Sequence, residues 1–507
     1  MAFVKTNNIS IAAAIESSLG TLPGSPVWLL LEPNSLSSYG KTLTKVARNP
    51  ISRLRQRRKG TTTDLDSGVE FEADLTGEHF QWFAEGFVFA RFANPTVIQE
   101  VQAGSDFDTL AAATNAFTHT AITAIPQDTL VYARGFTNSE NNGLFVVDTG
   151  ATTTNTPLSG TPGTVAETPA QTSNARLSVA GFRTAAGDVD LTVNAGATGT
   201  LTSTILDFTT LGLTAGQFIH IGGLTSSTRY DSGRYGRARV TAIAANTLTI
   251  DKIDTDGTTG LQTEASGTNQ VDLLFGRFLR NVDVDNADYL ERSMQFELAL
   301  PDLGGVGTDE YYYAKGNFGD TMSISLPGQE KSTVTFGFVG TDSDDPTTTR
   351  ATGASAPLDP VQTTAYNTST DIARLRLVKT DDTGLTTCFK NMTITLANGV
   401  TAEKCLGTLG ALSLNTGNFL VDIETQATFD NGDVIAAISD NETITMDWVM
   451  KNGDGAIGFD IPAMTLGGGD LELPEGETVR VNLTGEAFAD PTLETSLGIS
   501  LFPTYPQ

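Results

Sequence analysis

Cysteine and histidine are scarce in this chain of 507 residues, which contains two cysteines and three histidines. Cys388 and Cys405 do not form a CxxC pair, so neither a zinc site nor a disulfide framework is expected. The chain also lacks a phosphate-binding loop, a dinucleotide-binding glycine motif, the HExxH motif and the GxSxG motif. We therefore expect no catalytic site, no metal and no cofactor.

Charged residues and long apolar runs are also few. Charged residues make up 18% of the chain, which is below the usual quarter. No segment approaches the eighteen apolar residues of a membrane span, and Glu16 interrupts the short Ile/Ala stretch near the N-terminus, unlike a signal peptide. We expect a protein with reduced thiols that is made in a cytoplasm and does not contact a membrane.

The charge that is present is divided unevenly. Through Gly60 there are nine Lys or Arg and two Asp or Glu, whereas the whole chain has a net charge of -28. The first sixty residues therefore carry about +7 and the remainder about -35. Six of the cations fall within twelve residues: Arg48, Arg53, Arg55, Arg57, Arg58 and Lys59.

This basic run has three interpretations: a solvated loop, a site for phosphate, or a contact with another copy of the chain. A nucleic-acid-binding protein would present a basic face over a whole domain, whereas here a short basic segment complements an acidic body. Guanidinium groups make bidentate pairs with carboxylates. We favour self-assembly, and Pro50 with the following TTTDLDSG favours a long loop or open hairpin over a helix.

Apolar residues mostly alternate with Thr, Ser and Gly, as in Met322, Ile324 and Leu326. A period of two is typical of half-buried strands. The sequence therefore predicts a mainly β protein.

Two helices interrupt this pattern. The first is predicted over 77–92, with Thr76 as N-cap and Glu78 near the positive end of the helix. A second, shorter helix is predicted after Asp430. Each helix follows an alternating strand, GVEFEADLT in one case and NFLVDIETQATF in the other, which suggests two related modules. Four residues place an apolar face on the first helix: Phe80, Phe83, Ala84 and Phe87.

Residues 93–276 have a different texture, with few charges and much Thr, Ala and Gly. TLVYARGFTNSENNGLFVVDT from Thr129 loosely matches QFIHIGGLTSSTRYDSGRYGRARVTAI from Gln217, so that Gly135 corresponds to Gly223. Both copies are interpreted as strand, glycine turn, polar loop and strand. We expect an inserted all-β accessory domain that faces outward.

Three long segments carry a family resemblance: PVWLLLEPNSLSSYGKTLTKVARNPISRLRQRRKG, PDLGGVGTDEYYYAKGNFGDTMSISLPGQEKSTVTFGFVGTD and GFDIPAMTLGGGDLELPEGETVRVNLTGEAFADPTLETSLGISLF. In pattern and order they resemble the major tail tube proteins of long-tailed, non-contractile bacteriophages, the siphophage tail tube family. The resemblance implies a β-sandwich with a flanking helix, whose sheet joins those of neighbouring subunits into a closed, barrel-like ring. It also implies a hairpin that reaches the next ring, which falls here on 41–59.

The resemblance therefore divides the chain into three parts. Residues 1–92 would form the N-terminal part of a first tube module, with the inter-ring arm at 41–59 and the helix at 77–92. Residues 93–276 would form the insert, and residues 277–507 the remaining strands and a second tube module.

The implied partner is the chain itself, in stacked rings that are either trimeric with pseudo-sixfold symmetry, which we prefer, or hexameric. Further implied partners are the tape measure protein and DNA inside the lumen, bound without sequence specificity, and the tail tip and terminator proteins. The protein would belong to the virion tail after synthesis in the host cytoplasm. An acidic wall would repel DNA phosphates, and alternation nominates five lumen-facing carboxylates: Glu70, Glu72, Asp74, Asp422 and Glu424.

Two other functions would fit parts of the sequence. A virion adhesin or carbohydrate-binding decoration protein would use the Thr-rich insert and the tyrosine run at 311–313. That run is more typical of a strand that alternates between a core and an interface. A polysaccharide depolymerase would need paired catalytic carboxylates on a short-period solenoid, and the sequence has neither.

Overall fold

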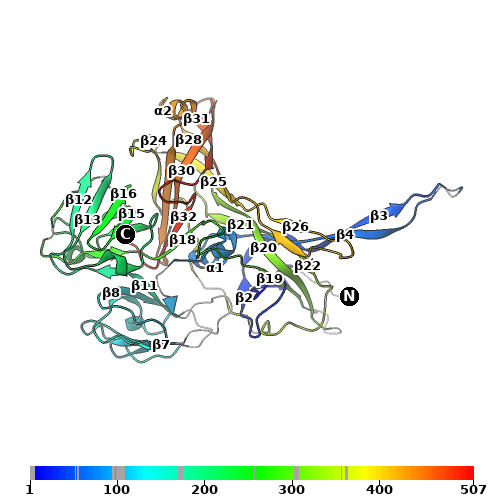
Figure 1. Cartoon of the computed structure of the whole chain (residues 1–507), viewed down its shortest axis with the longest axis horizontal. Coiled ribbons are helices and arrows are strands. Elements are labelled where there is room, and N and C mark those ends of the chain that lie inside the picture. The colour runs from blue at the N-terminus through cyan, green and yellow to red at the C-terminus, as the bar shows by residue number, and fades with distance from the viewer. Residues whose placement is uncertain are drawn as a thin grey trace.

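Strands dominate the computed structural model, as predicted (Figure 1). Among the described residues there are two α-helices. One long hairpin projects alone from the body, on the side away from the insert of residues 93–276 (Figure 1). The structure describes residues 6–51, 53, 56–93, 97–98, 109–169, 175–255, 257–265, 267–301, 308–355, 357–359, 363–386, 388–430 and 432–506.

An antiparallel path of eight strands forms the centre of the body, in the order β3-β4-β21-β20-β25-β28-β31-β30. Strands β20 and β25 pair at the middle of this path, from Thr321 opposite Ala397 to Leu326 opposite Met392. The bounds along the path are β3 (Pro33–Arg48), β4 (Arg58–Asp74), β21 (Thr333–Gly340), β20 (Glu310–Leu326), β25 (Phe389–Ala397), β28 (Leu420–Thr428), β31 (Arg480–Ala487) and β30 (Gly455–Glu472).

The same strand order occurs twice in this body. The path β3-β4-β21-β20 has its counterpart in β25-β28-β31-β30, and a second path, β2-β1-β19-β20, has its counterpart in β24-β23-β29-β30. We call the first set module 1 and the second set module 2. The additional bounds are β1 (Ser10–Ile15), β2 (Trp28–Leu31), β18 (Arg277–Arg280), β19 (Met294–Leu300), β22 (Asp342–Ser343), β23 (Ile372–Lys379), β24 (Gly384–Thr386), β26 (Thr401–Glu403), β27 (Ser413–Asn415), β29 (Ile444–Asn452) and β32 (Gly498–Phe502).

Each module carries one helix directly after the second strand of its path, as the sequence predicts. Helix α1 (Gly77–Val88) follows β4, and α2 (Asp433–Ser439) follows β28. The hydroxyl of Thr76 accepts a hydrogen bond from the His79 backbone N–H at 3.3 Å and so caps α1. This local signal in the sequence therefore placed the helix start correctly.

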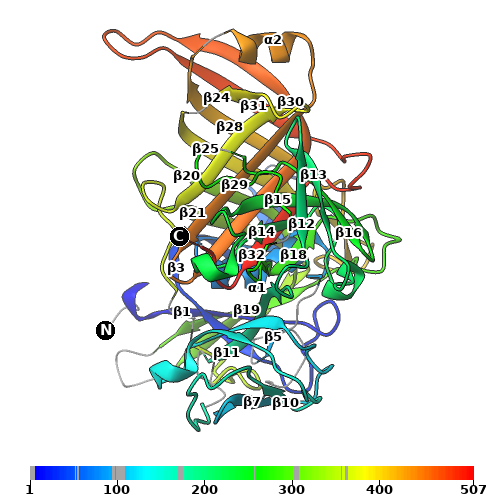
Figure 2. The same ribbon diagram turned by 90° about the vertical axis from the view of Figure 1, so that its left-hand side faces the viewer.

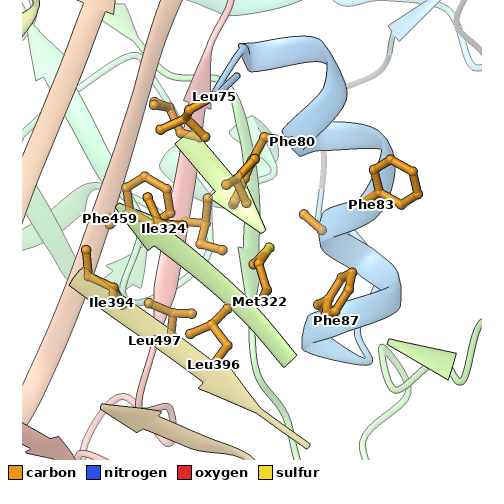
Figure 3. Packing of buried hydrophobic residues seen from close by; sticks show 14 of the residues in the cluster. Leu75, Phe80, Phe83, Phe87, Met322, Ile324, Ile394, Leu396, Phe459 and Leu497 are labelled. Carbon is orange, nitrogen blue, oxygen red and sulfur yellow. The ribbon is translucent and has the colours of Figure 1, made fainter. Parts of the chain in front are cut away.

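Helix α1 covers the apolar, buried face of the sheet with aromatic side chains (Figure 3). Phe83 is 1% exposed, and its ring centroid lies 5.7 Å from that of Phe71 and 4.8 Å from that of Phe336. Phe80 and Phe87 are fully buried beside it. The predicted apolar helix face is therefore the centre of the module 1 core.

The predicted end of this helix is wrong, because α1 stops at Val88 rather than at residue 92. Phe89 adopts the left-handed conformation, with φ of 51°, and its ring packs edge-on against Phe318 at 5.8 Å. A bulky residue in this conformation ends a helix. Packing of Phe89, which the sequence period does not encode, decides the boundary.

The insert has a hydrophobic core of its own, made of residues between Leu110 and Phe275. Its ends lie together, since the N–H of Ala93 donates to the carbonyl of Phe278 at 2.8 Å and the reverse bond measures 3.4 Å. The main sheet has the order β12-β13-β16-β15-β14-β17-β11-β8-β9, with β5 also on β11, and a small sheet has the order β10-β7-β6. The bounds are β5 (Val97–Ile98), β6 (Leu110–Ala113), β7 (Ala116–His119), β8 (Thr129–Arg134), β9 (Gly143–Val146), β10 (Asn155–Pro157), β11 (Arg176–Arg183), β12 (Asp190–Asn194), β13 (Thr198–Thr202), β14 (Phe218–Ile221), β15 (Gly236–Ala244), β16 (Thr247–Asp251) and β17 (Asp272–Leu274).

The internal repeat of the insert appears as two strand, glycine, short 3-10 helix and strand units. They comprise β8, η2 (Ser139–Asn141) and β9, and β14, η4 (Ser226–Thr228) and β15. Gly135 has φ of 79°, and the glycine in the matching conformation is Gly222, with φ of 98°, rather than Gly223. The expected correspondence was therefore displaced by one residue.

Candidate self-assembly surfaces

The basic segment forms the far part of the β3–β4 hairpin, which we call the arm (41–59). The ladder of this hairpin continues to its last pair, Arg48 opposite Arg58. At about 3.3 Å per residue, the strand from Lys41 to Arg48 spans about 25 Å. This is the open hairpin that the sequence predicts, and it projects away from the rest of the chain (Figure 1).

The cations of the arm tip have no partner among the described residues. Arg55 lies outside the described residues. The other five predicted contact residues are exposed, and none makes an ion pair with a described residue: Arg48, Arg53, Arg57, Arg58 and Lys59. The structure therefore brings the described cations together at one tip, where no described residue neutralises their charge.

The base of the arm, in contrast, is held by ion pairs. Lys41 Nζ lies 2.8 Å from a carboxylate oxygen of Asp345. Lys404, next to β26, lies 2.7 Å from Asp64 and 2.6 Å from Asp66 on β4. Such exposed pairs stabilise little individually, but they come from two directions and orient the arm relative to the body.

The carboxylates nominated by alternation are all at least partly accessible, while their strand neighbours are buried. Glu70 and Asp422 are exposed, and Val69, Phe71 and Ile423 beside them are buried. The pairing across strands places polar residues on the same face, because Asp422 lies opposite Thr395. The accessible members of the set are Glu70, Glu72, Asp74, Asp422 and Glu424.

Cations are few on this polar face, but Arg480 of β31 pairs with Thr428 and Glu472, and Lys390 lies on β25. The segments 33–40, 67–74, 333–340, 318–326, 391–397, 420–428, 481–487 and 464–472 contain no Lys or Arg. They contain nine carboxylates: Glu70, Glu72, Asp74, Asp320, Asp422, Glu424, Asp470, Glu472 and Glu486.

Asp74 is the nominated carboxylate with a neutralising partner. It accepts hydrogen bonds from Asn34 at 2.5 Å and from Lys331 at 2.7 Å. Burial raises the pKa of Asp74, but these two hydrogen bonds outweigh it and hold the pKa below its usual value. Asp74 therefore adds less repulsive potential to the face than Glu70 or Asp422.

Both ends of the eight-stranded path are open edges. In the described residues, 33–40 of β3 pair with β4 alone, and 465–472 of β30 pair with β31 alone. Their outward backbone N–H and C=O groups can each accept a further antiparallel strand. One chain thus offers two complementary sheet edges.

The insert is joined to the helix side of the body, opposite the polar face. Glu78 of α1 is largely buried and forms ion pairs with Arg134 and, at 2.5 Å, with Arg176 of the insert. Burial raises the pKa of Glu78, but the two guanidinium groups outweigh this effect and lower the pKa. The sequence suggested only a helix-end charge for Glu78, because its partners are remote along the chain.

A second ionic contact joins the insert to module 2. Asp447 of β29 is fully buried and accepts a hydrogen bond from Arg374 Nε at 2.6 Å. A guanidinium nitrogen of Arg237 of the insert lies 3.6 Å from the same carboxylate. Burial raises the pKa of Asp447, but the surrounding guanidinium groups lower it to about 2. Close by, Arg239 of the insert lies 3.0 Å from Asp460. No sequence signal indicated these contacts.

The tyrosine run does not form an open platform. Tyr313 is 3% exposed and donates a hydrogen bond to Glu297 at 2.6 Å. Tyr312 packs edge-on against Tyr39 with ring centroids 5.4 Å apart. These contacts fit the structural interpretation of the run.

Comparison with known protein families identifies the chain. The model of the phage tail tube protein family matches residues 6–487. The chain belongs to this family. It is thus a structural protein of the phage virion, a component of the tail, and it assembles with copies of itself into a tube. No curated protein matched the chain. Among the described residues, no helix has the length and apolarity needed to span a membrane.

Proposed function

We propose that this protein assembles into closed rings that stack into the tail tube of a long-tailed, non-contractile phage, and that the tube conducts the genome during delivery. The observation that carries this proposal is the pair of open edges at the two ends of one eight-stranded path. Closure into a ring removes exposed edges that would otherwise pair at random.

The pairing that would close the ring already exists once inside the chain. Strand β20 of module 1 pairs with β25 of module 2. By the repeated strand order, β30 is the counterpart of β20, and β3 is the counterpart of β25. The same geometry would therefore pair β30 of one chain with β3 of the next.

Two modules per chain favour a trimeric ring with pseudo-sixfold symmetry. Three chains contribute six copies of the four-stranded unit, the number that a hexamer of single-module subunits would supply. A hexameric ring of this chain would contain twelve units and enclose a wider channel, because barrel diameter grows with strand number. We prefer the trimer.

The polar face would line the channel. Its carboxylates, which outnumber Lys390 and Arg480, would repel the phosphates of DNA and keep water and counterions between DNA and wall. Glu70, Glu72, Asp422 and Glu424 would contribute most to this potential. The tape measure protein would occupy the same channel before DNA, and the tail tip and terminator proteins would close the two ends of the tube. None of these roles requires catalysis.

In this arrangement the insert faces outward, because it binds the helix side of the body through Glu78. Its two ends lie close together, since Ala93 is hydrogen-bonded to Phe278, two residues beyond the insert, and this supports removal of the whole unit. A variant with a short linker in place of 93–276 should still form tubes, with a smaller outer diameter. Loss of all assembly by this variant would place the insert in the tube wall.

Electron microscopy of the purified protein tests the proposal. Hollow tubes or stacked rings are expected. A cysteine pair placed across the proposed junction, Ser38→Cys with Gly467→Cys, should link neighbouring chains under mild oxidation, whereas Ser38→Cys with Leu466→Cys should not, because residue 466 points to the opposite face. A protein that remains a monodisperse monomer at high concentration would refute ring formation.

A further inference from the structure

The two ends of the strands in the eight-stranded path differ in charge, and this defines a polarity of the subunit. The arm leaves β3 and β4 at one end. The other end contains Asp74, which lies opposite Thr333. Direct pairing carries this level across the sheet to Thr484 opposite Gly467, and Arg480 opposite Glu472 lies beyond it in the same direction. The β30–β31 turn (473–479) therefore lies at the end opposite the arm, and the two ends would form the two rims of a ring.

The β30–β31 end is acidic and partly apolar. Residues 470–480 contain four carboxylates, Asp470, Glu472, Glu475 and Glu477, and one cation, Arg480. Arg480 forms an ion pair with Glu477, and Glu472 accepts a hydrogen bond from Gln426 at 2.6 Å. Two leucines also face solvent here, Leu471 at 44% and Leu473 at 73% exposure.

The arm tip has the complementary features. Its described cations are exposed and without an ion-pair partner among the described residues. Ile51, between them, is fully exposed. The tip thus matches the acidic and partly apolar β30–β31 end in charge and in kind of side chain.

We propose, on the basis of the proposed ring stacking, that the arm of one chain docks on the β30–β31 end of a second copy in the adjacent ring. The arginines of the tip pair with carboxylates of 470–477, and Ile51 packs against Leu471 and Leu473. Donor and acceptor surfaces are different parts of the chain, so the contact is head-to-tail and propagates into a filament instead of closing on itself.

The corresponding end of module 1 is a poorer acceptor. In the β20–β21 turn, Glu330 is followed by Lys331, which is already paired with Asp74 at 2.7 Å, and Lys390 is exposed nearby on β25. The charges of this end are therefore balanced. Of the two module ends in each chain, the β30–β31 end is therefore the acidic one. Docking of the arm at this end would fix the rotation between successive rings.

A charge exchange in the full chain tests the assignment. The arm variant Arg57→Glu/Arg58→Glu and the end variant Glu472→Arg/Glu475→Arg should each form rings but lose tubes in electron microscopy. The chain with all four substitutions should form tubes again. Mixing the two separate variants should also restore tubes, since each then meets its complement in the other ring. Glu330→Arg serves as the matched control and should leave tubes intact.

The outcomes separate this inference from the proposed function. Wild-type protein without rings or tubes would remove the proposed function itself. Wild-type tubes, together with variants that form rings but recover no tubes either in the fourfold variant or on mixing, would overturn only the docking assignment. A Glu330→Arg variant that loses tubes as completely as Glu472→Arg/Glu475→Arg would also overturn it.

Discussion

Arg48 and Arg58 face each other as the last cross-strand pair of the β3–β4 ladder. Like charges directly opposite one another on a sheet are destabilising, and neither guanidinium has an ion-pair partner among the described residues. Intrachain stability therefore does not account for this pair. The proposed contact with carboxylates of another chain would account for it, because carboxylates between the two guanidinium groups would replace repulsion with attraction.

Ring stacking should depend on salt more strongly than ring closure does. The Debye length falls to about 3 Å at 1 M salt, which screens exposed ion pairs, whereas backbone pairing between β30 and β3 would be less affected. We expect high salt to convert tubes to free rings in sedimentation velocity and microscopy. Tubes that persist in high salt would contradict this prediction. So would tubes that break down directly to single chains, without free rings at any salt concentration.

Charge reversal on the polar face should impair genome delivery without affecting the tube. Glu72→Lys with Asp422→Lys would place cations in the proposed channel, where they would hold DNA phosphates. We expect normal tubes in microscopy and a large loss of infectivity per particle. Glu140→Lys, an exposed reversal in the insert, is the control and should infect normally. Full infectivity of the double variant would remove both residues from the channel.

Phe83 should be a main determinant of module 1 stability. It is 1% exposed and packs against Phe71 and Phe336, so Phe83→Ala should lower the free energy of unfolding by about 3–5 kcal/mol. Urea denaturation of unassembled protein measures the change. Phe488, which is 40% exposed, provides the control, since Phe488→Ala should change it by no more than about 0.5 kcal/mol.

Acid should loosen the contact between the insert and the body. The folded pKa of Glu78 is depressed, so its stabilisation is complete above its unfolded pKa of about 4.3 and is lost as the pH falls through the lower folded pKa. We expect lower protection factors, which correct exchange rates for the intrinsic pH dependence of amide exchange, in β8 and β11 below pH 4 than at pH 7. Glu78→Gln should show the low protection factors at both pH values; identical protection in wild type and variant at pH 7 would argue against the role of this ion pair.

Removal of the buried carboxylate of Asp447, at the second contact between insert and body, should lower the free energy of unfolding more than removal of the Glu78 carboxylate. Asp447→Asn leaves Arg374, Arg376 and Arg237 without their shared anion, and breaking a buried pair in this way costs about 3–5 kcal/mol. Asp440→Asn changes an exposed carboxylate after α2 and should be nearly neutral. Equal unfolding midpoints for the two variants in urea would contradict the assignment.

The features that sequence alone predicted are those set by neighbouring residues. Alternation identified the strands and the accessible face of Glu70 and Asp422, because side chains alternate between the two faces of a strand. Thr76 marked the start of α1 through a hydrogen bond three residues away. The charge contrast between residues 1–60 and the rest of the chain also indicates the arm from sequence alone.

What could not be predicted depends on contacts between residues that are distant in the chain. The end of α1 is decided by packing of Phe89 against Phe318. The buried ion pairs of Asp447 form only after module 2 meets the insert, and each partner alone resembles an ordinary surface charge. The position of the acidic β30–β31 end, opposite the arm, follows from the strand order and not from the local sequence.

A cryo-electron microscopy reconstruction of the assembled tube at side-chain resolution would show directly which face of the eight-stranded path lines the channel. We expect a closed wall made of β3–β4–β21–β20 and β25–β28–β31–β30 units, with Glu70, Glu72, Asp422 and Glu424 facing the channel and the insert outside. A channel lined by the insert, or a wall in which these carboxylates face the exterior, would contradict this expectation.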